Sequence, residues 1–71
     1  MPAIPFAEAA LAHNLVRNRE SVGMSQKELA HAAGIRIEIL NRVERGVTVP
    51  AVRTLTKIET ALVKAGLKRK R

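Results

Sequence analysis

The helical organisation of this chain is set by residues 25–46, which read SQKELAHAAGIRIEILNRVERG. Ser25 and Glu28 have the spacing of a capping box, in which the serine hydroxyl and the glutamate carboxylate each accept a hydrogen bond from a free backbone N–H. Met24 and Leu29 flank this start at the positions of a hydrophobic staple. Gly34 then suits the left-handed residue that commonly ends a helix. These signals predict a helix from residue 26 to residue 33.

A further helix follows after only three residues, Gly34-Ile35-Arg36. Its apolar spacing predicts a helix from about Ile37 to Arg45, ended by Gly46. Two short helices joined by a three-residue turn that starts with glycine match the helix-turn-helix unit. We therefore expect this unit over residues 25–45.

The flanking segments also have helical spacing. A first helix is predicted from about Pro5 to Ser21, with Leu11, Leu15 and Val22 on one stripe. A fourth is predicted from about Ala51 to Ala65, with Leu55, Ile58 and Leu62 as its buried stripe. Gly23 and Gly66 stand alone, as residues that end helices do.

The chain carries no pattern typical of strands. Phe6 is its one aromatic residue, and the short run Val47-Thr48-Val49 is bounded by Gly46 and Pro50. The sequence thus predicts an all-α fold of four helices, with one domain over residues 1–67. We expect the basic run 68–71 to be a disordered tail.

Length and composition limit what the chain can be. It has 71 residues and no cysteine, so disulfides and thiolate metal sites are excluded. A single core of this size supplies at best roughly 3–5 kcal/mol, which makes a second copy of the chain the simplest source of further stability. The missing cysteines fit a reducing cytoplasm.

The charge balance points to a polyanionic partner. The formal net charge is +7, from 13 basic residues, six Glu and no Asp. It stays positive without the four basic residues of the tail, so the folded part is basic as well. Nucleic acid is the commonest such partner. The most apolar stretch, 2–12, is 11 residues long and too short for a membrane span, which needs about 20.

The helix predicted at 37–45 has two different faces. Leu40 and Val43 lie on one side, Ile37 and Ile39 lie at the borders, and polar residues fill the opposite side, namely Glu38, Asn41, Arg42 and Arg45. An ordinary surface helix has the same pattern. The basic charge, the short turn and the capped helix before it favour a DNA-reading face.

The motif S-Q-x-E-L-A…G-I…R-V-E-R-G, with Pro50 and the stripe 55–62 after it, resembles the helix-turn-helix family of phage Cro and phage repressors, the XRE-like regulators. The resemblance runs from about Leu11 to Leu62. It implies a lambda-repressor-like fold in which helix 37–45 enters the major groove of DNA.

The resemblance also implies roles for single residues. Base edges would be read by Arg36, Ile37, Glu38 and Arg42. The DNA backbone would be contacted by Gln26, Lys27, Asn41, Arg45 and Arg53; for Asn41 and Arg45, simple solvation is the alternative. Arg19 and Glu44 match a pair that forms an internal ion pair in this family, the alternative being a solvated pair worth at most about 1 kcal/mol.

Three departures from the family pattern stand out. Arg36 occupies the N-cap, where Ser or Thr is usual, and we expect it to be retained for a phosphate or base contact. The loop Val47-Thr48-Val49 lacks the basic or polar residues common at this place in the family, so Arg53 would supply backbone contacts instead. The apolar segment 4–7 either covers the end left open by a missing fifth helix, forms a dimer contact, or frays.

We expect a sequence-specific, cytoplasmic and nucleoid-associated regulator of transcription, a repressor that binds a near-palindromic operator as a homodimer. The alternative is an antitoxin that binds a protein toxin through Ile37, Ile39, Val47 and Val49 and represses its own operon. A third possibility is an architectural protein that binds DNA through charge alone. We expect no catalysis, cofactor or metal, because His13 and His31 lie on different helices without a third ligand.

Overall fold

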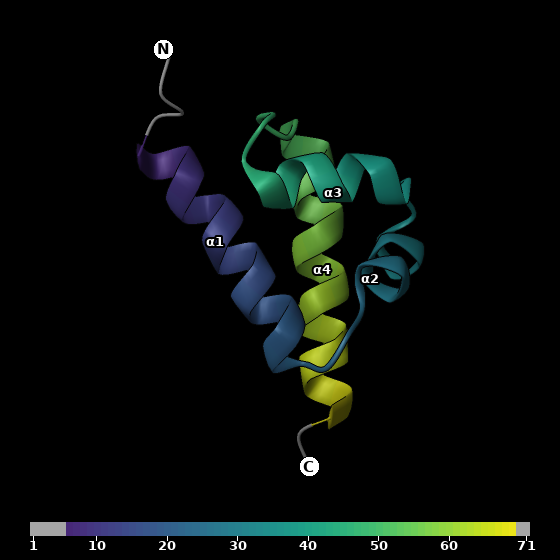
Figure 1. The fold of residues 1–71 in the computed structure, drawn as a ribbon. Helices are drawn as coiled ribbons and strands as arrows, with labels where there is room; N and C mark the ends of the chain where they lie inside the picture. The colour runs from purple at the N-terminus through teal and green to yellow at the C-terminus, as the bar shows by residue number, and fades with distance from the viewer. Residues whose placement is uncertain (1–5, 70–71) are drawn as a thin grey trace.

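The computed structural model describes the backbone of residues 6–69 and the side chains of residues 10–66. Four helices make up this part of the chain, and it contains no strand, which confirms the all-α prediction (Figure 1). Their bounds are α1 Phe6–Ser21, α2 Gln26–Ala33, α3 Ile37–Arg45 and α4 Val52–Arg69. Pro5, the predicted first residue of α1, lies outside the described residues, as do Ile4 and the ends of the chain.

All four helices contribute to one core. Its fully buried side chains are Leu29, Leu40 and Ile58, with Leu15 and Val43 almost as deep. Helix α4 packs against α2, while α3 packs against both α1 and α2. In Figure 1, α3 lies across the beginning of α4. The predicted stripes of the first and last helices therefore face the core, where Leu11, Val22 and Leu55 pack at its margin.

The two short helices begin and end as the local sequence predicts. At the start of α2, the Ser25 Oγ accepts a hydrogen bond from the Glu28 backbone N–H at 3.0 Å, and the Glu28 carboxylate accepts one from the Ser25 N–H at 2.8 Å. Gly34 and Gly46 end α2 and α3 with φ of 71° and 74°. Residues with a side chain rarely adopt this left-handed backbone conformation, so glycine fits both positions.

The predicted end of the fourth helix at Ala65 is wrong, since α4 continues to Arg69 and includes Gly66. A lone glycine lowers helix stability by only about 1 kcal/mol relative to alanine, which packing can offset. A Cβ built at Gly66 would lie 3.8 Å from a methyl group of Val22, at ordinary contact distance. Two residues of the expected tail, Lys68 and Arg69, are therefore helical, and 70–71 lie outside the described residues. Within the described range, no helix is long and apolar enough to cross a membrane.

Candidate DNA-binding surface

The outer face of α3 and the first residue of α2 share one open hollow on the surface. Its lining consists of Gln26, Ile37, Glu38, Asn41, Arg42 and Arg45. All of these were singled out by sequence as DNA contacts. The helix-turn-helix geometry brings them together because the short turn sets the start of α2 beside α3. Lys27, Arg36 and Arg53 are also exposed but lie outside this lining.

The basic side chains of this face are available to a ligand. Arg36, Arg42 and Arg45 are exposed, and among the side chains of residues 10–66 none of them takes part in an ion pair or hydrogen bond. Glu38 is exposed between them. Ile37 is 40% exposed, enough to offer an apolar contact beside these charges. The face thus combines hydrogen-bond donors with a carboxylate acceptor and an apolar group.

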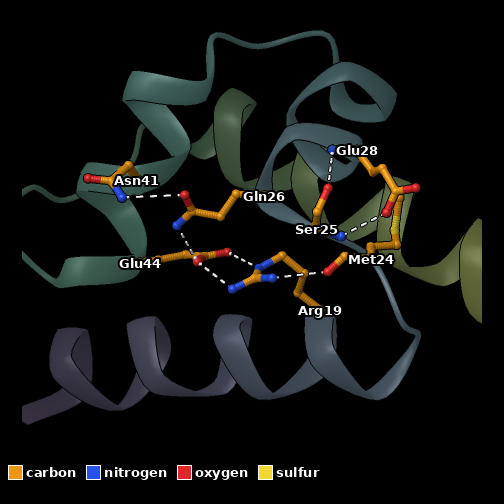
Figure 2. Close-up of polar contacts among 7 residues, drawn as sticks. All are labelled: Arg19, Met24, Ser25, Gln26, Glu28, Asn41 and Glu44. Carbon is orange, nitrogen blue, oxygen red and sulfur yellow. Dashed lines mark hydrogen bonds and ion pairs between the residues drawn. The ribbon is translucent and has the colours of Figure 1, made fainter.

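Behind this face, Arg19 of α1 and Glu44 of α3 form an internal ion pair (Figure 2). The Arg19 Nε and Nη2 donate to the two carboxylate oxygens at 2.8 and 3.1 Å. The side chains are only 14% and 3% exposed, so the alternative of a solvated surface pair does not hold. Two parallel bonds of this kind are strong and fix direction, which ties α1 to α3.

The Glu44 carboxylate also binds the side chain of Gln26. The Gln26 Nε2–H donates to the Glu44 Oε1 at 2.8 Å, and the Gln26 Oε1 accepts a hydrogen bond from the Asn41 Nδ2–H at 3.4 Å. Figure 2 shows Gln26 between Asn41 and Glu44, with Arg19 completing the chain. Both amides are half-buried. A polar network from α1 through α3 to α2 therefore lies directly under the hollow.

The first turn of α2 leaves backbone donors unused. The capping box takes the N–H groups of Ser25 and Glu28, so those of Gln26 and Lys27 have no partner within the helix. Such groups, at the positive end of a helix, suit an anion such as phosphate. The exposed Lys27 adds a positive charge at this point.

The start of α3 differs from that of α2. Arg36 is its N-cap and makes no side-chain capping hydrogen bond. A cation here also opposes the positive end of the helix dipole. Beyond the other end of α3, the loop presents Val47 and Val49, and Arg53 lies exposed in the first turn of α4.

Sequence reasoning missed the bond between Gln26 and Glu44, the bond between Asn41 and Gln26, and a third contact. In that contact, the Arg19 Nη1 donates to the backbone carbonyl of Met24 at 3.0 Å and braces the turn before α2. No spacing rule predicts these bonds, because the partners lie on different helices. The one signal was the match of Arg19 and Glu44 to a family pair.

The described residues contain no group of three or more His, Asp or Glu side chains placed to hold a metal ion. His13 and His31 are both exposed on their helices.

Comparison with known proteins agrees with this geometry. The family model described as "Helix-turn-helix" matches residues 15–62. An uncharacterized HTH-type transcriptional regulator of Haemophilus influenzae is 36% identical over 55 residues, which cover 78% of this chain and 56% of that protein. Vegetative-specific protein H7 of Dictyostelium discoideum is 33% identical over 60 residues, or 84% of this chain and 58% of that protein.

The chain therefore spans a little over half the length of these curated relatives. No solved structure matches it. The family match covers the capped α2, the turn, α3 and most of α4, including the Arg19–Glu44 pair and the whole lining of the hollow. The chain belongs to the XRE-like helix-turn-helix family, a family of DNA-binding transcriptional regulators.

Proposed function

We propose that the chain is a transcriptional repressor that binds a near-palindromic operator as a homodimer, with α3 in the major groove. The observation that carries this proposal is the outer face of α3, where Arg42 and Arg45 lie exposed beside the start of α2 and form no ion pair with the described side chains. The net charge of +7 adds attraction to DNA at any sequence.

Each base-reading residue offers a distinct preference. Arg42 can donate two hydrogen bonds to guanine O6 and N7, which is worth roughly 1–3 kcal/mol against a wrong base. Glu38 can only accept, so it favours the N4 amino group of cytosine and disfavours phosphate. Ile37 suits a thymine methyl group. Arg36 lies at the end of α3 that enters the groove and contacts a base or a phosphate.

The remaining contacts would fix the position of α3. Gln26 and Lys27, at the start of α2, contact a phosphate, which sets register without reading sequence. Arg45 and Arg53 contact the backbone on the other side of the groove. The buried Arg19–Glu44 pair keeps α1 and α3 in one orientation throughout.

A homodimer follows from two considerations. Two recognition helices about 34 Å apart would occupy successive major grooves on one side of the duplex. A core as small as this one also gains stability from a partner copy. Sedimentation of the chain with its operator tests this directly, because one monomer per duplex would exclude the mechanism.

The first experiment is a fluorescence-anisotropy titration at near-physiological salt. It compares a duplex from upstream of the chain's own gene with a shuffled duplex of the same composition. A preference of about a thousandfold or more is expected for a specific regulator. Equal binding to both duplexes would contradict base reading and leave only charge-driven, architectural binding.

The antitoxin is the second candidate, and the exposed valines favour it. Val47, Val49 and Val52 are 57%, 60% and 81% exposed around the loop between α3 and α4. A protein partner would cover these side chains, whereas valine can neither donate a hydrogen bond to a DNA phosphate nor pair with its charge. A small toxic protein encoded by the neighbouring gene should then co-purify with the chain and be lost in the Val49→Asp variant. Co-expression without any complex would exclude this candidate.

A further inference from the structure

Asn41 differs from the other polar residues on the outer face of α3. Arg42, Arg45 and Glu38 are exposed, whereas Asn41 is half-buried and turns its amide toward α2. Its Nδ2–H donates to the Oε1 of Gln26 at 3.4 Å (Figure 2). We propose that Asn41 is a positioning residue, which holds the Gln26 side chain in the orientation that binds a DNA phosphate. This role rests on the proposed function.

The orientation of both amides follows from Glu44. Its ionised carboxylate can only accept hydrogen bonds, and Arg19 holds it in place through two of them. Gln26 must therefore turn its amino group toward Glu44, where Nε2 lies 2.8 Å from Oε1. The Gln26 oxygen then faces Asn41, which must offer an N–H in return.

This arrangement leaves one donor of Gln26 for a ligand. A glutamine amide carries two N–H groups, and Glu44 takes one of them. The other belongs to a side chain that lines the hollow, next to the unused backbone N–H groups at the start of α2. Gln26 can therefore donate to a phosphate while it keeps both internal bonds.

Holding the side chain in advance favours binding. A glutamine that rotates freely loses conformational entropy when it binds a phosphate, and one already held at both ends of its amide loses less. Glu44 alone fixes the amino end and lets the group pivot about that bond. Asn41 fixes the oxygen end, so α3 sets the position of the phosphate contact made by α2.

A double-mutant cycle separates this role from a direct contact between Asn41 and DNA. The full chain is titrated by anisotropy against the upstream duplex and its shuffled counterpart, at a temperature where circular dichroism shows every variant folded. Asn41→Ala is expected to weaken binding to the upstream duplex about two- to tenfold, the effect of one neutral hydrogen bond. In a Gln26→Ala background the same change should have almost no effect. Asn18→Ala, an exposed asparagine of α1, is the control and should leave affinity unchanged.

A measurement on the free protein supplies a readout without DNA. The ¹⁵N relaxation of the Gln26 side-chain amide should show a rigid group in the wild-type chain and a more mobile one in Asn41→Ala. Unchanged relaxation would overturn the role of Asn41. So would equal losses of affinity in the wild-type and Gln26→Ala backgrounds, because additivity means that Asn41 acts on DNA by itself. Equal binding of the wild-type chain to both duplexes would instead overturn the proposed function, and this role with it.

Discussion

The inner and outer faces of α3 belong to the same nine-residue helix but differ in their surroundings: the inner face is buried against other helices, and the outer face is exposed. On the inner face Leu40 and Val43 are buried, and Glu44 accepts three hydrogen bonds from two other helices. On the outer face Arg42 and Arg45 are exposed, without an ion pair among the described side chains. The polar groups of the inner face thus have their partners within the chain, whereas Arg42 and Arg45 of the outer face have none among the described side chains.

The difference shows how one short helix serves both stability and binding. Buried groups with every hydrogen bond made contribute to a single orientation of α3, since any tilt would break several contacts at once. Exposed charged groups contribute little to folding. Changes on the inner face should therefore mainly alter stability, and changes on the outer face should mainly alter DNA binding.

The largest effect is expected on the inner face, from Leu40→Ala. Leu40 is completely buried, and truncation of such a leucine lowers the free energy of unfolding by about 2–5 kcal/mol. A core of this size supplies only roughly 3–5 kcal/mol, so the variant should be largely unfolded at room temperature. Urea denaturation followed by circular dichroism measures this. Ile39→Ala, the neighbouring residue at 42% exposure, is the control and should remain folded.

The second largest effect is expected from a substitution on the outer face. Arg42→Ala should remove about 1–3 kcal/mol of preference for the upstream duplex over the shuffled one. Its free energy of unfolding should stay within about 0.5 kcal/mol of the wild-type value, because the side chain is exposed. Anisotropy and urea denaturation measure the two quantities. Arg17→Ala removes an exposed arginine from α1 and controls for the loss of charge. If it erased the preference equally, base reading by Arg42 would be excluded.

The bounds of α2 and α3 could be predicted because their signals are local. Ser25 and Glu28 lie three residues apart, and each meets the other's backbone whatever the rest of the chain does. Gly34 and Gly46 likewise adopt left-handed backbone where the local sequence places them. A short-range pattern is sufficient wherever the stabilising contact is itself short-range.

The end of α4 could not be predicted in this way. Gly66 has the form of a stop signal, yet its penalty of about 1 kcal/mol competes with the packing of the whole helix. That packing is tertiary, and position 66 lies near Val22, 44 residues earlier and just after α1: a Cβ built at Gly66 would lie 3.8 Å from a Val22 methyl group. A tertiary contact of this kind leaves no trace in the sequence around the glycine.

The candidate site also has a part that the sequence predicts and a part that depends on contacts between helices. The residues of the outer face followed from helical periodicity and from the resemblance to a family. The contacts beneath it did not, because Gln26 and Asn41 are oriented by the buried carboxylate of Glu44, which is in turn held by Arg19 from a different helix. Each bond depends on the one before it, so no pairwise pattern reveals the set.

A smaller effect is expected from substitution of Arg36 at the start of α3, which should change stability and DNA binding in opposite directions. Arg36→Ser should raise the free energy of unfolding by about 1 kcal/mol, because serine can cap the helix and the unfavourable charge is gone. Binding to the upstream duplex should weaken at the same time. Arg36→Ala is the matched control, since it removes the charge without adding a cap and should weaken binding with less gain in stability. Unchanged affinity in both variants would show that Arg36 contacts neither base nor phosphate.

The smallest effect is expected from Glu38→Gln, which should lower stability and strengthen binding to DNA of any sequence. Glu38 lies in the first turn of α3, where its negative charge favours the helix, so neutralisation should lower the free energy of unfolding by roughly 0.3–1 kcal/mol. Binding to shuffled duplex should become stronger, because a charge that repels phosphate is gone, and discrimination at the position read by Glu38 should fall. Titrations of both duplexes at two salt concentrations separate the two changes. Glu59→Gln, on the exposed side of α4, is the control for charge and should strengthen binding much less. Equal gains from both variants would mean that Glu38 acts through net charge alone, and that the outer face of α3 reads sequence without it.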